Sequence, residues 1–251
     1  MERSLDNNNF TFFNNNGWVV ERKIFTLSEI NIIKEKINNF LKKNISEYKG
    51  RDINFFNEVP SIENINSFHK MDDCTFIQKL ALESKIFEIS KKYLESKKPD
   101  LRACELFAKP KWNGLSAPVH QDNFYWCVND ANALTIWLAL DDTNEENGGV
   151  FYYDGSHKNG IFEHIPSFAK GSSQKIKNNV ELKKYNISIP KLNKGDCVVH
   201  HSLTAHGSKE NKSDRNRCGL TFQYKSENSY YDNKLKLKYE KSLNSQISTR
   251  N

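Results

Sequence analysis

The sequence predicts a mainly β protein with flanking helices, whose core is a sandwich or a jelly-roll barrel. Short runs of β-forming residues follow one another after Pro99, whereas helical spacing dominates before it. Turn residues separate the β-type runs, as is usual in sandwiches and barrels. At 251 residues the chain is long enough for one substantial core, and we expect a single domain over residues 1–251. The clearest turns are Gly148-Gly149, Asp154-Gly155 and Lys194-Gly195-Asp196.

The part before the β-rich region divides into a loose start and a layer of one strand and helices. Residues 1–16 are polar and Asn-rich and are expected to be loose, and residues 17–98 should form the strand and helical layer. Trp18 to Phe25 has the composition of a strand. Apolar residues then recur at helical spacing in two segments. These are Glu29 to Lys43, with Ser28 as N-cap and Ile30, Ile33, Ile37 and Leu41 on one face, and Cys74 to Ser96.

Residues 99–225 are expected to form the jelly-roll core. The tail from Ser226 to Asn251 alternates charge with a few apolar residues, and both a terminal helix and a mobile tail fit that pattern. The β-type runs of the core are Ala103–Ala108, Ala133–Leu140, Gly149–Tyr153, Val180–Ile189, Cys197–His201 and Arg217–Tyr224.

The composition argues against nucleic-acid and membrane partners. The 37 Lys and Arg against 31 Asp and Glu give a net charge of +6, but the lysines are scattered, which favours a solvated surface over nucleic-acid binding. No apolar segment has the character of a signal peptide or the length of a membrane span. Five cysteines without a CxxC pair indicate neither a disulfide framework nor a zinc knuckle, and we interpret them as core or strand residues. We therefore expect a cytoplasmic protein.

The most informative feature is the pair His120 and Asp122, joined to the remote His206. Two imidazoles and one carboxylate are the ligands that hold Fe(II) on one face and leave the opposite face open for oxygen chemistry. Strand residues two apart point the same way, so His120 and Asp122 can both face a barrel interior. The HxD triplet alone is weak evidence, because chance supplies one in roughly one chain in three of this composition.

A second motif, from His206 to Arg217, carries more weight. It reads HGSxxNxSxxxR, and its random odds at this composition are on the order of 10⁻⁵. His206 follows the apolar run Cys197-Val198-Val199 and can supply the third ligand from another strand. Arg217 precedes another apolar run, where its guanidinium could clamp a carboxylate bidentately. His200 and His201 are alternative third ligands, but neither is followed by Gly-Ser-xx-Asn, and this favours His206.

These motifs resemble the phytanoyl-CoA dioxygenase family of Fe(II)- and 2-oxoglutarate-dependent oxygenases, which includes the ectoine hydroxylases. The resemblance covers nearly the whole chain, from Gly17-Trp18-Val19-Val20 to Tyr224. One departure is Asp154, where the family more often has a proline before the glycine. The residues that carry the resemblance are His120-Gln121-Asp122, Leu134 to Asp142, Glu146-Asn147-Gly148-Gly149, Gly155-Ser156-His157 and the motif from His206 to Arg217.

The resemblance implies a double-stranded β-helix, a cupin-like jelly roll, and a role for each matching residue. It assigns iron to His120, Asp122 and His206, the distal carboxylate of 2-oxoglutarate to Arg217 and Ser208, and the lining of the co-substrate pocket to Gln121 and Trp137, with Lys70 as a candidate for the family's upstream lysine.

The expected activity is hydroxylation of a small or medium organic substrate by a monomer or homodimer, using Fe(II), 2-oxoglutarate and O2 and releasing succinate and CO2. Related halogenases replace the carboxylate ligand with a small residue, so Asp122 favours hydroxylation. The alternative is a non-catalytic metal-binding jelly-roll protein, and Arg217 with Ser208 argues against it, because a pure metal site has no use for a dicarboxylate clamp. A structural zinc protein would instead have a closed tetrahedral site.

The sequence defines the substrate side less well. Trp126 could form an aromatic wall or pack in the core, and His201 is a candidate for lining the cavity. The loop from Ser167 to Lys175 could close as a lid, although a solvated loop is the more common outcome. Relatives act on acyl-CoA thioesters, amino-acid derivatives, phosphonates and secondary metabolites, and the fold does not choose among them. The remaining histidines, expected to be surface residues, are His69, His157 and His164.

Overall fold

The computed structural model describes residues 2–57, 61–169 and 172–248. The strands are β1 (Trp18–Glu21), β2 (Ile53–Phe55), β3 (Ile65–Phe68), β4 (Asp100–Lys109), β5 (Ala117–His120), β6 (Ala133–Ala139), β7 (Val150–Tyr153), β8 (His164–Ala169), β9 (Ser172–Ile176), β10 (Ile187–Ser188), β11 (Cys197–His201), β12 (His206–Ser208) and β13 (Arg217–Lys225). The helices are α1 (Glu2–Asn16), α2 (Leu27–Asn44), α3 (Thr75–Glu83), α4 (Lys85–Leu94), α5 (Asp122–Trp126) and α6 (Asn233–Ser248).

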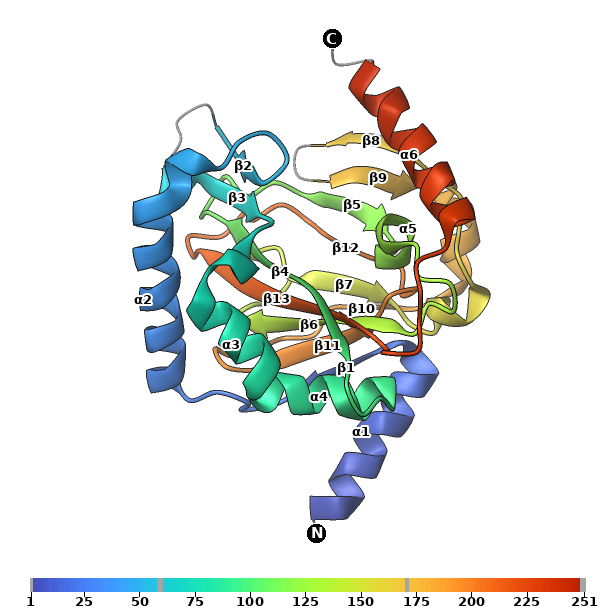
Figure 1. Ribbon diagram of the computed structural model, residues 1–251, viewed down its shortest axis with the longest axis horizontal. Helices are drawn as coiled ribbons and strands as arrows, with labels where there is room; N and C mark the ends of the chain where they lie inside the picture. Colours follow the sequence, from blue (N-terminus) through green and yellow to red (C-terminus); the bar gives the residue numbers. More distant parts are fainter. Residues whose placement is uncertain (1, 58–60, 170–171, 249–251) are drawn as a thin grey trace.

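Two antiparallel sheets build the core (Figure 1). The large sheet has seven strands in the order β1-β11-β6-β13-β4-β3-β2, and the small sheet has four in the order β10-β7-β12-β5. Strands β8 and β9 form a separate hairpin. Long-range neighbours such as β1 with β11 and β13 with β4 show that each sheet is woven from distant parts of the chain. The prediction of a mainly β protein with a jelly-roll core and flanking helices is confirmed.

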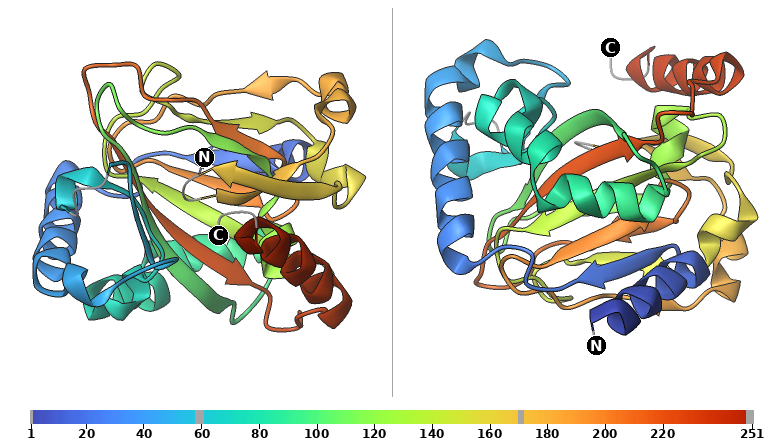
Figure 2. Two further views of the ribbon diagram at one scale, coloured as in Figure 1. Left: turned by 90° about the horizontal axis from the view of Figure 1, so that it is seen from above. Right: turned by 60° about the horizontal axis from the view of Figure 1, so that its bottom comes forward.

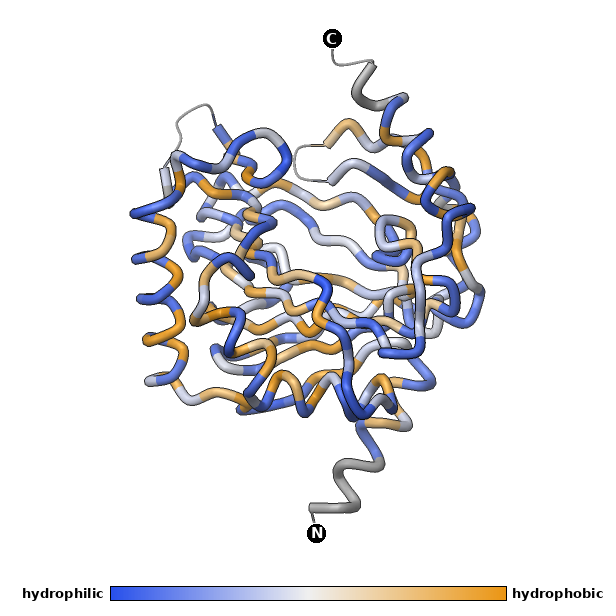
Figure 3. Tube along the Cα trace, in the orientation of Figure 1, coloured by the Kyte–Doolittle hydropathy of each residue, from blue (hydrophilic) through white to orange (hydrophobic). Residues whose placement is uncertain are grey.

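Helices α2, α3 and α4 cover the outer face of the large sheet (Figure 2). The predicted face of α2 is buried, and Figure 3 shows its apolar positions on the side turned toward the sheet. From β6, alternate residues Leu134, Ile136 and Leu138 enter this same apolar core. The other residues of β6 therefore point toward the small sheet, because side chains alternate along a strand. The inward face of the large sheet is the surface on which the site is built.

The N-terminal segment is a helix, α1, and the prediction of a loose segment over residues 1–16 is wrong. Its anchor is aromatic: the ring of Phe13 lies 4.8 Å from that of Tyr93 in α4, and Phe12 packs edge-on against Trp18. Phe13 is buried by these contacts, whereas Phe12 remains exposed, and the Asn-rich surroundings hide this apolar anchor in the sequence.

The first long helix begins earlier than predicted. Its N-cap is Thr26, not Ser28, and Thr26 forms a capping box with Glu29. The second predicted helix, Cys74 to Ser96, is broken in two at Ser84, whose hydroxyl accepts from the backbone N–H of Ile86 and starts α4. Local side-chain capping decides both boundaries.

The structure also decides the conformation of three later segments. The run Val180–Ile189 is mostly a 3-10 helix (Asn179–Lys184), because the side chain of Asn178 caps it, and only β10 is a strand. The loop predicted over Ser167–Lys175 falls largely in strands β8 and β9, which pair with each other, and its residues 170–171 lie outside the described residues. Of the two alternatives for the C-terminal tail, the structure has the helix, α6, whose Tyr239 packs against Phe124 and Tyr125 of α5. Within the described residues, no helix is both long and apolar enough to cross a membrane.

Gly195→Ala is expected to lower the free energy of unfolding by about 2 to 4 kcal/mol. Gly195 has a φ of +90°, and an added Cβ would overlap the backbone carbonyl of Phe25, which enters from the segment after β1. Denaturant unfolding of the variant measures the loss. Gly50→Ala is the matched control: its φ is also positive, at +60°, but nothing lies near the added carbon, so about 1 kcal/mol should be lost. Equal losses at the two positions would contradict the close approach at Gly195.

Candidate active site

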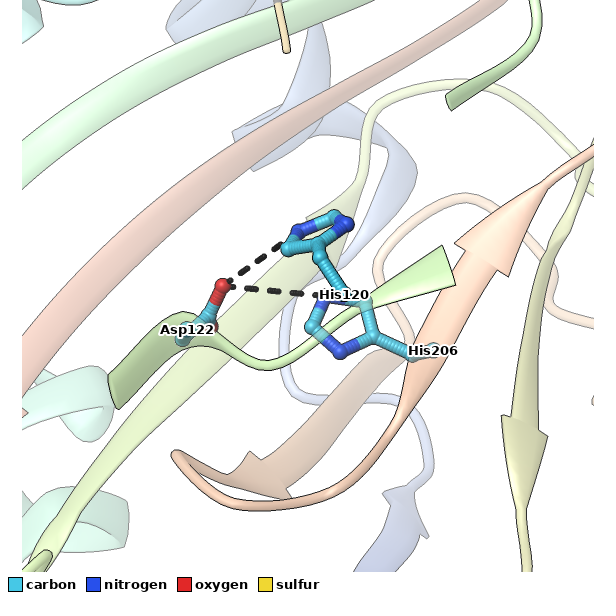
Figure 4. A group of neighbouring side chains, drawn as sticks. All are labelled: His120, Asp122 and His206. Carbon is cyan, nitrogen blue, oxygen red and sulfur yellow. Dashed lines mark ion pairs between the residues drawn. The ribbon is translucent and has the colours of Figure 1, made fainter. Parts of the chain in front are cut away.

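The three predicted metal ligands meet inside the jelly roll, between the two sheets (Figure 4). His120 ends β5 and His206 begins β12, and these two residues are paired directly in the small sheet. Asp122 is the first residue of α5, so the expectation that it shares a strand with His120 is wrong. The turn at Gln121 still brings it to the same place, and one ligand atom from each of the three residues lies within 4.8 Å of the others.

Both imidazoles present Nε2 to the centre of this cluster. Nδ1 of His120 lies 2.8 Å from the carbonyl oxygen of Pro118, and Nδ1 of His206 lies 2.8 Å from that of Thr204. A carbonyl oxygen only accepts, so each Nδ1 carries the proton and each Nε2 keeps a free lone pair. The two Nε2 atoms lie 3.6 and 3.7 Å from Oδ1 of Asp122.

The second carboxylate oxygen of Asp122 is held by the large sheet. The Thr135 hydroxyl donates to Oδ2 at 2.7 Å, and Nε2 of His200 lies 3.0 Å from it. Burial alone would raise the pKa of Asp122, but the three imidazoles around the carboxylate, those of His206, His120 and His200, hold that pKa well below its usual value. The carboxylate is therefore ionised, with Oδ1 turned toward the two imidazoles.

His200 is a site residue, although the candidate predicted to line the cavity was its neighbour His201. The ring of His200 lies 4.4 Å from that of His206, and its Nδ1 lies 3.3 Å from the Tyr152 hydroxyl. His201 points to the opposite face of β11, toward Phe13 of α1, and burial lowers its pKa to about 3. The prediction that His201 lines the cavity is therefore wrong. The sequence could not decide between adjacent strand residues, because only the register of the sheet fixes which one faces inward.

These residues fit a divalent metal. Burial and the nearby imidazoles of His120 and His200 lower the pKa of His206 well below its usual value, so this imidazole is neutral. Metal binding requires neutral imidazoles and an ionised carboxylate, and His206 and Asp122 are in that state. The hydrogen bonds at each Nδ1 and at Oδ2 of Asp122 are the supporting contacts that orient metal ligands in proteins.

A second cluster, here called the basic cluster, consists of Arg217, Lys109, Ser208 and Trp137. The guanidinium carbon of Arg217 lies 4.7 Å from the centre of the Trp137 ring. Lys109, paired with Arg217 across β4 and β13, donates to the Ser208 hydroxyl at 2.7 Å and to the carbonyl of Lys209. Both side chains are buried, and no acid in the described part of the chain forms an ion pair with either. A buried guanidinium without a paired acid, beside an amine that can take up a proton, favours an anionic ligand.

The electrostatics of the basic cluster support this interpretation. Burial lowers the pKa of Arg217 to about 10, so the guanidinium stays charged at neutral pH. Burial, together with the charge of Arg217, lowers the pKa of Lys109 to about 6. The buried Nε of Arg217 has no hydrogen-bond partner in the described structure. A bound carboxylate would supply that partner and restore the charge of Lys109.

Gly219 is what allows Trp137 to lie beside Arg217. The two strands β6 and β13 are neighbours, and a Cβ at position 219 would overlap the indole ring of Trp137. The absence of a side chain there lets the indole cross the strand and form the wall of the basic cluster.

Two residues assigned to the co-substrate by resemblance lie elsewhere. Lys70 is exposed where a short 3-10 helix (Met71–Asp73) begins, and the lysine that contacts Ser208 is Lys109. Gln121 is fully buried, and its amide is engaged by backbone groups of the surrounding loops. It donates to the carbonyls of Gly160 and Leu203 and accepts from the N–H of Phe162. The structure therefore gives Gln121 a role in holding loops together, which corrects the expectation that it lines the pocket.

The remaining aromatic candidates are mostly buried. Trp126 packs with Val128 and Ala133, which is the core alternative for this residue. His164 is buried, so the expectation of a surface residue is wrong: its Nε2 accepts from the N–H of Gln121, and its ring stacks on Phe124 at 4.2 Å. His69 and His157 are partly buried. The cysteines are unpaired, and four of the five are buried.

The fold and the two clusters define a jelly-roll protein with a three-residue cluster that could hold a metal ion and a buried basic cluster beside it. The family model described as phytanoyl-CoA dioxygenase matches residues 13–219, and the chain belongs to the phytanoyl-CoA dioxygenase family. A curated relative, phytanoyl-CoA dioxygenase domain-containing protein 1 of Bos taurus, is 28% identical over 199 residues, covering 75% of this chain and 65% of the relative. The peroxisomal phytanoyl-CoA dioxygenase of Bos taurus is 25% identical over 234 residues, covering 88% and 68%. The chain thus spans 65% and 68% of the length of these two relatives.

Solved structures share the fold at lower identity. The α-ketoglutarate-dependent carbocyclase SnoK from nogalamycin biosynthesis matches with a TM-score of 0.71 at 19% identity, covering 89% of this chain and 85% of SnoK. EctD from S. alaskensis, solved with 2-oxoglutarate and 5-hydroxyectoine, matches with a TM-score of 0.71 at 18% identity, covering 86% and 74%. At these identities the likeness shows the architecture.

Thr135→Val is expected to weaken divalent-metal binding by about 10- to 100-fold. The change keeps the shape of the side chain but removes the hydroxyl that holds Oδ2 of Asp122. Anaerobic titration with Fe(II) measures the affinity. Thr143→Val is a matched control, because that hydroxyl is also buried but bonds only to the backbone of Asp141. Unchanged affinity in Thr135→Val would contradict its role in orienting the carboxylate.

Proposed function

We propose that this protein is an Fe(II)- and 2-oxoglutarate-dependent dioxygenase that hydroxylates a small or medium organic substrate and releases succinate and CO2. The observation that carries the proposal is the presence of the His120–Asp122–His206 cluster and the basic cluster together inside one barrel. Further support comes from the titles of two neighbours: EctD with 2-oxoglutarate, and the epimerase SnoN with Fe3+ and α-ketoglutarate.

His120, Asp122 and His206 would hold the iron through two Nε2 atoms and Oδ1. Bound together, iron and 2-oxoglutarate supply the chemistry that splits O2, decarboxylates the co-substrate and hydroxylates the substrate. The chain keeps this geometry fixed: the carbonyls of Pro118 and Thr204 set the imidazole tautomers. Thr135 and His200 restrain the carboxylate from the opposite sheet.

The basic cluster would bind the distal carboxylate of 2-oxoglutarate. Arg217 offers a planar fork of donors, and Trp137 supports its flat face. Ser208 adds a hydroxyl from β12 of the small sheet, and Lys109 adds an ammonium group from β4, the neighbour of β13 in the large sheet. Burial strengthens each of these contacts, because little water competes for the anion. The proposal thus uses every member of the cluster.

The runner-up function is a non-catalytic metal-binding jelly-roll protein. It accounts for the metal centre but leaves the buried charge of Arg217 and the neighbouring amine of Lys109 without a ligand, and an unpaired buried charge is costly. We also propose a cytoplasmic location, supported by five unpaired cysteines, and a monomeric or homodimeric protein.

The proposed function is tested by succinate formation from 2-oxoglutarate with Fe(II), ascorbate and O2, using the wild-type protein and Arg217 variants. Arg217→Ala should raise the KM for 2-oxoglutarate by about 100-fold or more, because charge-assisted bonds to the distal carboxylate are lost. Arg217→Lys should restore little, since an ammonium group cannot form the bidentate contact. Arg215→Ala, which removes an exposed arginine paired with Glu146, should leave the KM unchanged. Failure of the wild-type protein to bind 2-oxoglutarate at millimolar concentration would favour the runner-up function.

Binding of 2-oxoglutarate is expected to take up about one proton at pH 7.5. The pKa of Lys109 is about 6 without an anion, so at this pH the amine is largely neutral, and the carboxylate should raise that pKa and draw in a proton. The affinity for 2-oxoglutarate should therefore fall as the pH rises above 6, because less Lys109 is protonated before binding. Calorimetry in buffers of different ionisation enthalpy measures the uptake, and Lys109→Met should abolish it. Proton uptake that persists in this variant would assign the proton to another group.

A further inference from the structure

Beside the metal centre, polar side chains line the inward face of the large sheet. Thr135 marks this face, because it donates to Asp122. Gln223 is paired with Thr135 across β13 and β6, and directly paired residues of an antiparallel ladder project from the same face. Nε2 of Gln223 donates to Oε2 of Glu105 at 2.7 Å. Gln223 and Glu105 therefore both face the barrel interior.

These side chains belong to a connected network, here called the polar wall, which consists of Arg102, Glu105, Gln223 and His69. Arg102 donates to Oε1 of Gln223 at 2.6 Å, and Oε1 of Glu105 lies 2.9 Å from Nδ1 of His69. Nε2 of His69 in turn lies 2.9 Å from the hydroxyl of Ser67. The network fixes each side chain in one orientation, which is how a preorganised binding surface is built.

Solvent reaches the polar wall to about the same extent as the metal centre. The side chains of Glu105 and His69 are 16% and 24% exposed, and those of His120 and Asp122 are 14% exposed. A substrate that reacts at the metal must lie close to this surface. An acyl chain there would strip water from the carboxylate without replacing its hydrogen bonds, at a cost of several kcal/mol. The polar wall therefore disfavours an apolar substrate.

The carboxylate of Glu105 is the group of the polar wall that can accept a further hydrogen bond, whereas Nε of Arg102 is buried without a partner among the described residues. Arg102 bonds to Gln223, and its guanidinium lies 5.0 Å over the ring of Trp126, so it does not neutralise Glu105 directly. In the described part of the chain, the ion pair of Glu105 is with His69 alone. Each carboxylate oxygen receives one side-chain hydrogen bond and can accept another. A cationic hydrogen-bond donor would complete this site.

We propose that the carboxylate of Glu105 binds the ammonium group of the primary substrate, and that the enzyme acts on a small amine or amino-acid derivative rather than on an acyl thioester. This inference rests on the proposed function. Gln223 and His69 are positioning residues that orient the two carboxylate oxygens. Glu105 lies on β4, two strands from Thr135 on β6, a spacing of about 10 Å. The reacting carbon therefore lies a few bonds from the nitrogen, as in a molecule of the size of lysine.

The test is a panel of primary amines and free amino acids, each assayed with its N-acetylated form, together with octanoyl-CoA. At least one amine should stimulate succinate formation, and its N-acetylated form should not. Glu105→Gln keeps the shape of the side chain but removes its charge, and it should raise the KM for that amine by about 10- to 100-fold. Glu105→Asp keeps the charge and should raise the KM less. Glu145→Gln, at an exposed acid paired with Lys209, should behave as the wild type.

The visible absorption of the anaerobic complex with Fe(II) and 2-oxoglutarate separates the two hypotheses. If this absorption is missing in the wild-type protein, the proposed function fails. If it forms but only octanoyl-CoA, or no amine, stimulates turnover, the role of Glu105 is overturned and the proposed function stands. An unchanged KM for the amine in Glu105→Gln also overturns that role. If the Glu105→Gln variant does not form the complex with Fe(II) and 2-oxoglutarate, the KM for the amine is compared between the wild type and Glu105→Asp. The aspartate keeps the negative charge but draws it back by one methylene group.

Discussion

The functional centre depends on one carboxylate that joins the two sheets. Asp122 turns Oδ1 toward the imidazoles of the small sheet, while Thr135 and His200 of the large sheet hold Oδ2. The metal-binding geometry is therefore a property of the packing between sheets. Because Asp122 begins α5 rather than continuing β5, its carboxylate can reach across the gap to the opposite sheet.

The large sheet supplies three different environments from one face. The row with His200 and Thr135 restrains the metal centre, and the neighbouring strands carry the polar wall. Arg217 at the start of β13 and Lys109 at the end of β4 are directly paired and form the third environment. The outer face of the sheet is apolar and packs on the helices, so strand alternation alone separates the stabilising core from the chemistry.

Much of this organisation could be predicted from the sequence, because it is encoded in short motifs. The motifs around His120, Asp122, His206 and Arg217 predicted the three residues of the metal cluster and the arginine of the basic cluster. Lys109 and Thr135 could not be predicted in the same way, since their positions depend on the register between strands distant in the chain. Helix α1 was missed for another reason: its stability comes from tertiary contacts of a few phenylalanines within an Asn-rich segment.

The direct pairing of His206 with His120 has a consequence for folding kinetics. The two strands that carry these residues are separated by most of the jelly roll, so the loop between them must close before the imidazoles meet. Such contacts of high sequence separation form slowly. The complete metal site therefore exists only once the small sheet is assembled, and ligation acts on the native state by mass action rather than guiding early collapse.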